Sequence, residues 1–218
     1  MSRTACLTLM FKSPQRSKQR LAGEIGVRAI DAAQQLLACA VADLQAWSGP
    51  TCLAPAGPAD ALYARTHGYV ADMQIVQSEG NLGRRIESIA AVLTSAGHTR
   101  QIFIGSDCPG LDGAYLQAAT AALDTADVVL GPATDGGVVL MGVRGSWPPL
   151  EPLPWSSSQL GESLYRQCES AELHVAMLDE RSDVDTAAEL RRVPEALRAD
   201  TRPTRRKLCS WIVSELQV

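Results

Sequence analysis

Short apolar runs alternate with longer segments of helical periodicity along most of this 218-residue chain. The runs have the length of strands, and the segments between them repeat apolar residues at helical spacing. Such alternation is typical of βαβ units, and therefore of a mainly parallel sheet with helices on both faces. It predicts strands near residues 4–11, 51–54, 73–77, 101–105, 127–131, 138–143 and 173–178, and its clearest helices lie over 27–46, 82–96, 113–124 and 159–170.

One connection departs from the parallel pattern. In "DVVLGPATDGGVVLMG", residues 127–142, only a short Gly/Asp/Pro/Thr loop joins two strand-like runs. A parallel crossover needs a dozen or more residues, so one strand is predicted to run antiparallel. There is no internal repeat or linker-like change of composition, and the Pro-rich stretch 148–154 is interpreted as a surface loop. We therefore expect a single α/β domain, for which this length is ordinary.

Charge and cysteine content exclude several classes of protein. A net charge of -4 and a pI near 5.4 argue against a nucleic-acid binder. The one basic cluster, near the C-terminus, is interpreted as a solvated helix face and contains Arg202, Arg205, Arg206 and Lys207. The six cysteines form no C-x-x-C pair and are expected to be reduced thiols of a cytoplasmic protein. No apolar run approaches the roughly 20 residues that span a bilayer, so no membrane segment is expected.

An aspartate stands where the fourth predicted strand ends. Asp107, in "FIGSDCPGL", is followed by Cys108 and by Pro109, which prevents direct entry into a helix. Ligands of open α/β sheets collect at the carboxyl ends of the strands, so Asp107 is a candidate binding residue. Cys108 is interpreted as a packing residue, because no base can be assigned to it and a neighbouring carboxylate disfavours the thiolate.

A basic loop follows the first predicted strand. It carries Lys12, Arg16, Lys18 and Arg20 before a helix that begins near Leu21. Lysine and arginine both reach phosphate oxygens, so the loop suits a diphosphate or triphosphate, with Lys12, Lys18 and Arg20 as the phosphate-binding candidates. Neither a P-loop nor a dinucleotide-binding glycine motif is present. A solvated basic loop remains the alternative.

The stretch "EGNLGRRIES", residues 79–88, predicts a second turn that leads into a helix N-terminus. Free N–H groups and the helix dipole attract anions there, and Gly80 and Gly83 would allow close approach of a phosphate. Arg84 and Arg85 in the first turn are poorly placed unless an anion is present. Gly80 and Arg85 are therefore candidate nucleotide-binding residues, although ordinary turn glycines would give the same pattern.

Three further aspartates follow strands of the predicted sheet. Asp183 and Asp185, in "DERSDVDTAAEL", precede a helix that Asp185 or Thr186 could cap. Asp107 and one of these two, brought together in space, would form the sparse carboxylate pair that holds Mg²⁺ while phosphates and water fill its other positions. Asp135 lies in the tight "ATDGG" loop, where turn chemistry is an equally simple explanation.

Several of these segments together resemble one known family. "FIGSDCPGL", "VVLGPATDGGVVLMG", "LPWSSSQL" and "RSDVDTAAEL" are similar, in this order and spacing, to small bacterial transferases of the GT-A (nucleotide-diphospho-sugar transferase) fold, often labelled radical-SAM/selenodomain-associated transferases. The wider superfamily includes phospholactate guanylyltransferase, molybdenum-cofactor guanylyltransferase and the CMP-sugar synthetases. The resemblance implies a Rossmann-like nucleotide-binding domain over residues 1–192. Within it, Lys18 and Arg20 would grip phosphates, and Asp107, Asp185 and the nearby Asp183 would bind Mg²⁺ or Mn²⁺.

The chain departs from that pattern in three places. Its basic loop is shorter and has Ser17 where the family has glycine, and Val138 and Val139 replace an aromatic pair after "Asp-Gly-Gly". Residues 193–218 lie outside the shared region. Their helical face is expected to pack on the domain or to join two subunits of a homodimer, and it comprises Leu208, Trp211, Ile212 and Leu216.

These observations predict a metal-dependent transferase that moves the activated group of a nucleoside phosphate or nucleotide-sugar to a small acceptor. Asp107 and Lys18 would act by positioning and charge stabilisation, and Asp135 would orient the acceptor or accept its proton. One alternative is a nucleotidyltransferase that releases pyrophosphate. Another is a non-catalytic nucleotide-binding protein that retained the fold.

Overall fold

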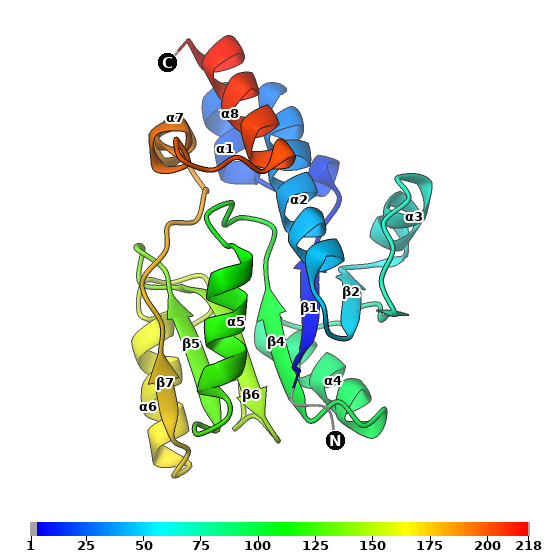
Figure 1. Cartoon of the computed structure of the whole chain (residues 1–218), viewed down its shortest axis with the longest axis vertical. Coiled ribbons are helices and arrows are strands. Elements are labelled where there is room, and N and C mark those ends of the chain that lie inside the picture. Colours follow the sequence, from blue (N-terminus) through cyan, green and yellow to red (C-terminus); the bar gives the residue numbers. More distant parts are fainter. Residues whose placement is uncertain (1–3, 218) are drawn as a thin grey trace.

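The computed structural model describes residues 4–217, and its centre is one mixed sheet with helices on both faces (Figure 1). The strand order is β3-β2-β1-β4-β6-β5-β7. The strands are β1 (Cys6–Phe11), β2 (Thr51–Pro55), β3 (Met73–Gln74), β4 (Arg100–Ile104), β5 (Val128–Pro132), β6 (Val138–Arg144) and β7 (Val175–Met177). This confirms the predicted fold class.

The helices are α1 (Gln19–Ile25), α2 (Arg28–Ala46), α3 (Pro58–Thr66), α4 (Leu82–Ser95), α5 (Gly113–Ala122), α6 (Leu160–Ser170), α7 (Ala187–Ala196) and α8 (Pro203–Leu216). The four helices predicted with bounds are present as α2, α4, α5 and α6, and α7 and α8 follow the last strand. A single 3₁₀ turn, Pro14–Arg16, precedes α1 in the basic loop.

The antiparallel strand is β6, as predicted. It pairs antiparallel with both β4 and β5, whereas the other strand pairs described in residues 4–217 are parallel. The two sheet edges are shorter than predicted, because β3 covers only two residues and β7 only three. Backbone bonds from Ile75 and Gln77 to β2 continue beyond β3, so the predicted extended segment is present although the regular strand is short.

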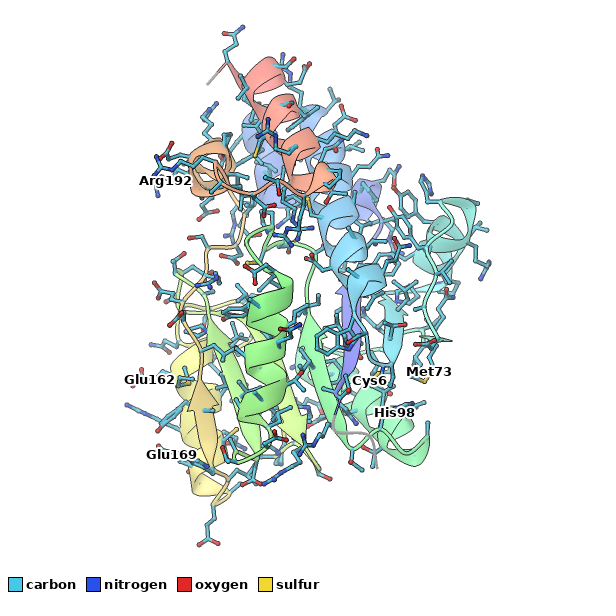
Figure 2. The ribbon with its side chains drawn as sticks, viewed as in Figure 1. Cys6, Met73, His98, Glu162, Glu169 and Arg192 are labelled. Carbon is cyan, nitrogen blue, oxygen red and sulfur yellow. The ribbon has the colours of Figure 1, made fainter. Side chains whose placement is uncertain are left out.

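Alternating side chains of the central strands divide the core between the two faces. Leu7 and Leu9 of β1 belong to the cluster under α2 and α5, and Cys6 and Met10 belong to the cluster under α4 and α6. On α6, Leu164 is buried, while the labelled Glu162 and Glu169 point away from the sheet (Figure 2). All six cysteines are free thiols, and five of them are buried.

Helix α8 forms a third cluster with α1, α2 and α7, beyond the carboxyl ends of the parallel strands (Figure 1). Leu208 and Ile212 are fully buried there, while Trp211 is half-buried. The expectation that this segment joins two subunits stays a prediction. None of the helices described in residues 4–217 is long and apolar enough to cross a membrane.

Packing of α8 gives a direct test. We expect Leu208→Ala to lower the free energy of unfolding by about 3 kcal/mol, because it leaves a cavity at a fully buried position. Val213→Ala on the exposed side of the same helix should change it by less than about 0.5 kcal/mol. Urea denaturation of both variants measures the difference, and equal losses would contradict the assigned packing.

Candidate functional site

The candidate site begins at the end of β4, where Asp107 follows the strand by three residues. Ser106 Oγ donates to Asp107 Oδ1 over 3.1 Å. The Val184 amide donates to the Asp107 carbonyl oxygen over 2.9 Å, and this bond joins the segment after β4 to the segment after β7. The carboxyl ends of two separate strands therefore meet at Asp107, as the parallel arrangement requires.

Lys18 brings the predicted site residues together. Its Nζ lies 3.0 Å from Asp107 Oδ1 and 2.8 Å from Asp185 Oδ1, and it also donates to the Val184 carbonyl oxygen. The Lys18 side chain is only 4% exposed, whereas those of Asp107 and Asp185 are 43% and 39% exposed. The ammonium thus lies beneath two carboxylates that face solvent. Burial alone would lower the pKa of Lys18, but the charges of Asp107 and Asp185 outweigh it and raise that pKa, so the group stays protonated.

The backbone at Lys18 is held in an uncommon conformation. Lys18 is the N-cap residue of α1 and has a φ of 54° and a ψ of 41°, in the left-handed region. For a residue with a side chain this costs roughly 1–2 kcal/mol, and it persists when surrounding contacts compensate. The buried ion pairs of Nζ are such contacts. At Lys18, the stabilisation gained from the two ion pairs thus outweighs the cost of the left-handed backbone conformation.

The segment that carries Asp185 is fixed by α7. Thr186 caps this helix in a capping box, with Glu189 accepting from the Asp185 and Thr186 amides over 2.8 Å each. The Glu24 carboxylate of α1 accepts from the Ala187 amide over 2.7 Å. The predicted cap is thus Thr186, which leaves the Asp185 side chain available to the site. Arg20 Nη1 lies 3.7 Å from Asp185 Oδ2 and is mostly exposed.

Asp183 and Asp135 form an acidic pair beside this cluster. Burial raises the pKa of Asp183 to about 6, and the negative charges of Asp135 and Asp185 add to the rise. Asp135 Oδ1 accepts from the Gly137 amide over 2.8 Å, as the turn explanation predicted. Gly136, with a φ of 87°, has no room for a side chain, because a Cβ would lie 2.1 Å from the Ser158 carbonyl oxygen. The turn that presents Asp135 therefore requires glycine.

The other phosphate-binding candidates are not among the described partners of Lys18, which are Asp107, Val184 and Asp185. Lys12 is exposed. Arg85 Nε donates to the Gly80 carbonyl oxygen over 2.9 Å, and Gly80 has a φ of 110°. Arg84 faces the Glu151 carboxylate at 3.6 Å. The arginines at the α4 N-terminus thus have partners within the protein, so their placement needs no external anion. The roles of Lys12, Gly80 and Arg85 toward a nucleotide stay predictions.

Sequence reasoning missed the anchor beneath Asp107, which is Arg205. The prediction of a solvated helix face was wrong here, because Arg205 is fully buried, although Arg206 and Lys207 are exposed. Its guanidinium donates to the Pro109 and Leu111 carbonyl oxygens over 3.2 Å each, to the Cys39 carbonyl over 2.7 Å, and to the Asp43 carboxylate. The available signal in the sequence was the position of Asp43 on the apolar stripe of α2, four residues after Cys39, because a carboxylate that faces a core needs a cationic partner.

Arg205 makes the C-terminal helix part of the support for the site. It ties α8 and α2 to residues 109–111, which begin two residues after Asp107. Cys108 is buried within this loop, and burial raises the pKa of its thiol to about 12. This agrees with a packing role for Cys108 and not with a nucleophilic one.

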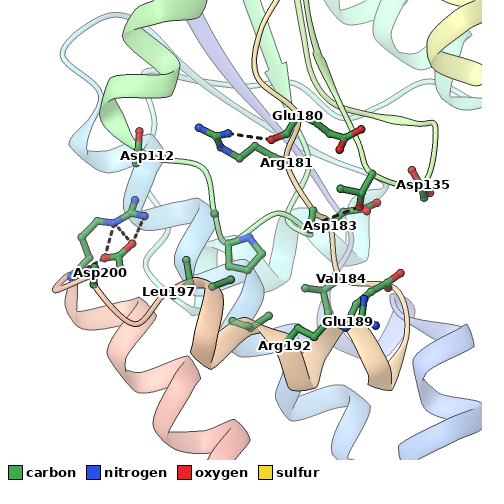
Figure 3. Close-up of a pocket in the computed structure, with 18 of the residues that line it drawn as sticks. Asp112, Asp135, Glu180, Arg181, Asp183, Val184, Glu189, Arg192, Leu197 and Asp200 are labelled. Atoms are coloured by element: carbon green, nitrogen blue, oxygen red, sulfur yellow. Dashed lines mark hydrogen bonds and ion pairs between the residues drawn. The ribbon is translucent and has the colours of Figure 1, made fainter.

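A large cavity adjoins the acidic pair. It has a volume of about 890 Å³ and lies between α7 and the loops that follow β4, β5 and β7, with Asp135 and Asp183 on one side (Figure 3). Much of its charge is already paired within the protein. Arg202 binds Asp200 and Asp43, and Glu189 caps α7. The cavity therefore offers a ligand less free charge than the number of charged side chains around it suggests.

The arrangement of carboxylates fits a divalent cation that is also bound by phosphates. One ammonium nitrogen contacts both Asp107 and Asp185, so their oxygens are close, and the half-buried Asp183 adds a third carboxylate beside them. Across residues 4–217, no group of three or more His, Cys, Asp and Glu side chains is arranged to hold a metal by itself. Mg²⁺ usually takes one or two carboxylates and fills its shell with phosphates and water, so a pair is sufficient.

Comparison with known proteins assigns the family. The family model described as "Uncharacterized protein conserved in bacteria (DUF2064)" matches residues 34–157, more than half of the chain. The chain belongs to this family. The region that matches the DUF2064 model includes Asp107 and Asp135, and Lys18, Asp183 and Asp185 lie outside it. Among curated proteins, none matches the sequence.

Solved structures share the fold of this DUF2064 protein. A protein assigned as a nucleotide-diphospho-sugar transferase, from Desulfovibrio desulfuricans G20, has a TM-score of 0.88 at 22% identity, with 100% of this chain and 98% of that chain covered. A CMP:2-keto-3-deoxy-manno-octonic acid synthetase in complex with CTP gives 0.54 at 14% identity, covering 90% and 99%. Rv0371c of Mycobacterium tuberculosis H37Rv, in complex with manganese, gives 0.51 at 18% identity, covering 88% and 99%. At these identities the likeness shows the nucleotide-diphospho-sugar transferase fold alone.

The Lys18 ion pairs in this DUF2064 protein can be tested by removing the ammonium group. Lys18→Met keeps the length of the side chain but leaves Asp107 and Asp185 facing each other without the ammonium. We expect the free energy of unfolding to fall by about 1–3 kcal/mol. Excess Mg²⁺ should raise the melting temperature of this variant more than that of the wild type, because the divalent cation replaces the lost charge.

Lys12→Met is the matched control, because it removes an exposed lysine of the same loop. Its stability and its response to Mg²⁺ should equal those of the wild type. A Lys18→Met protein that is as stable as the control, or indifferent to Mg²⁺, would contradict the arrangement described for Asp107 and Asp185.

Proposed function

We propose that this protein is a metal-dependent transferase that binds a nucleoside phosphate or nucleotide-sugar and transfers its activated group to a small acceptor. The observation that supports this most directly is the convergence of Lys18, Asp107 and Asp185 at the carboxyl ends of β1, β4 and β7. One buried cation and two exposed carboxylates meet at the place where open α/β sheets bind ligands. The likeness to a nucleotide-diphospho-sugar transferase supports the same class.

Asp107 and Asp185 would hold Mg²⁺ or Mn²⁺, with Asp183 close by. The bound cation would neutralise charge on the phosphate oxygens. Manganese is present in the Rv0371c complex, which supports this choice of metal. Lys18 would supply a fixed positive charge beneath the phosphates, and Arg20, near Asp185, would reach them from the solvent side. Lys12, Gly80 and Arg85 would contact the more distant parts of the nucleotide.

The transfer step needs a proton acceptor beside the acceptor hydroxyl. When the hydroxyl oxygen bonds to the anomeric carbon of a nucleotide-sugar, the bond from that carbon to the diphosphate oxygen breaks and a nucleoside diphosphate leaves. The hydroxyl proton must pass to a base. Asp135 and Asp183 are the candidates, because both carboxylates lie beside the Lys18 cluster and burial holds the pKa of Asp183 near 6.

Nucleotidyl transfer is the second candidate, and the shared fold of a CTP-bound synthetase favours it. There the acceptor oxygen would bond to the α-phosphorus of a nucleoside triphosphate, and the bond from that phosphorus to the bridging oxygen would break, so that pyrophosphate leaves. Assays of both products with both classes of donor separate the candidates. Pyrophosphate from a triphosphate indicates nucleotidyl transfer, and a nucleoside diphosphate from a nucleotide-sugar indicates glycosyl transfer. Binding without turnover of either donor would indicate a non-catalytic nucleotide-binding protein.

Asp107 gives the sharpest test of the proposed site. In the wild type, we expect a nucleoside triphosphate or nucleotide-sugar to raise the melting temperature, and to do so more strongly with Mg²⁺ or Mn²⁺. Asp107→Asn should abolish the metal-dependent part of this shift while the protein remains folded, because the amide keeps the shape but loses the charge. Asp179→Asn, an exposed carboxylate after β7, is the control and should behave as the wild type. Unchanged metal-dependent nucleotide binding in Asp107→Asn would contradict the proposed role of this site.

A further inference from the structure

A small apolar cavity opens beside Asp107 on the face of the sheet covered by α4 and α6. Its volume is about 180 Å³. Asp107 and Asp183 are the charged side chains that line it, so a ligand in this cavity would meet the carboxylates of the candidate site. The rest of the wall is almost entirely apolar and includes Ile86, Phe103, Val138, Met141, Trp155 and Leu160.

The wall is held in place by hydrogen bonds within the loop after β6 and from that loop to α4. Trp155 Nε1 donates to the Leu150 carbonyl oxygen over 2.8 Å, and the Leu150 amide donates to Glu87 Oε1 over 2.5 Å. Gly83 lets the two segments approach closely, because a Cβ there would lie 2.4 Å from the Leu150 carbonyl oxygen. The cavity is therefore formed by fixed segments and not by a loose loop. Leu82, which also lines the cavity, is 43% exposed and so adds apolar surface where the cavity meets solvent.

Size and polarity restrict what can bind there. An apolar cavity of about 150 Å³ is large enough for benzene, so this one accepts a group of similar size. Sugar hydroxyls or the polar edges of a nucleotide base would lose their hydrogen bonds against such a wall. The indole N–H of Trp155 is already used by Leu150. Lys18, Arg20 and Asp185 lie outside the lining, so phosphates bound by them would not enter the cavity.

We propose that this cavity binds an apolar part of the acceptor. The acceptor is then an amphipathic compound whose apolar group is about the size of a benzene ring and whose reacting oxygen lies at Asp107 and Asp183. This inference rests on the proposed transferase function and adds to it the chemical class of the acceptor. Val138 and Leu82 become residues that determine acceptor specificity, because both line the cavity.

Benzyl alcohol and glycerol are the probes for the experiment, since one carries an aromatic group on a hydroxyl and the other carries hydroxyls alone. Binding to the full chain is followed by ligand-observed NMR, with and without a nucleoside triphosphate and Mg²⁺. We expect benzyl alcohol, and not glycerol, to bind, and to bind together with the nucleotide. Val138→Phe, which fills the cavity, should weaken benzyl alcohol binding at least about tenfold. Val92→Phe adds the same bulk to an exposed position of α4 and should leave it unchanged.

Leu82→Asp provides a second variant at an exposed position, and it should also weaken benzyl alcohol binding even if Val138→Phe fails to fold. Metal-dependent nucleotide binding should survive in every folded variant. Benzyl alcohol that fails to bind, or that competes with the nucleotide, would overturn the apolar acceptor cavity while leaving the proposed function in place. A wild type that binds benzyl alcohol but no nucleotide would overturn the proposed function and, with it, the assignment of the bound group to an acceptor.

Discussion

One buried ammonium group organises the candidate site. Lys18 Nζ contacts Asp107, Asp185 and the Val184 carbonyl, and so joins the loop after β1 to the segments after β4 and β7. These segments are distant along the chain, and without the ammonium their two carboxylates would repel each other at short range. The cost of burying Lys18, and of its left-handed backbone, is offset by these ion pairs. The same geometry brings together the groups that a metal-bound nucleotide requires.

A second buried cation holds the loop that Lys18 meets. Arg205 binds the Pro109 and Leu111 carbonyl oxygens and the Asp43 carboxylate, and so attaches α8 to the backbone that follows Asp107. The C-terminal helix therefore does more than cover apolar surface. Through Arg205 it holds the backbone that follows Asp107, while Lys18 contacts the Asp107 carboxylate itself. The position of Asp107 therefore depends on Lys18, near the start of the sequence, and on Arg205, near its end.

The proposed reaction and the proposed acceptor use different parts of this framework. Charge is concentrated on the side of Asp107 where Lys18 and Asp185 lie, and apolar side chains cover the other side, under α4 and α6. The phosphates of the nucleotide and the apolar group of the acceptor would therefore bind on different sides of Asp107. Asp183 lies next to both the charged side and the apolar cavity, and burial raises its pKa. It is therefore a potential proton acceptor where the two regions meet. This separation of charge and apolar surface makes phosphates and an apolar acceptor compatible in one site.

The sequence by itself determined the sheet, its antiparallel strand and the strand-end position of Asp107, because strand and helix periods and short loops are local properties of the chain. It also indicated Lys18 and Asp185 as candidates, through a basic loop and an acidic motif after strands. Only the tertiary structure decided that Lys18 lies between the two carboxylates, that Arg205 is buried and that Arg84 and Arg85 have partners within the protein. Those outcomes depend on which distant segments meet, and burial and long-range ion pairs leave no periodic signal in the sequence. The sequence pattern thus predicts the candidate residues, and the tertiary structure determines which of their charged groups are in contact.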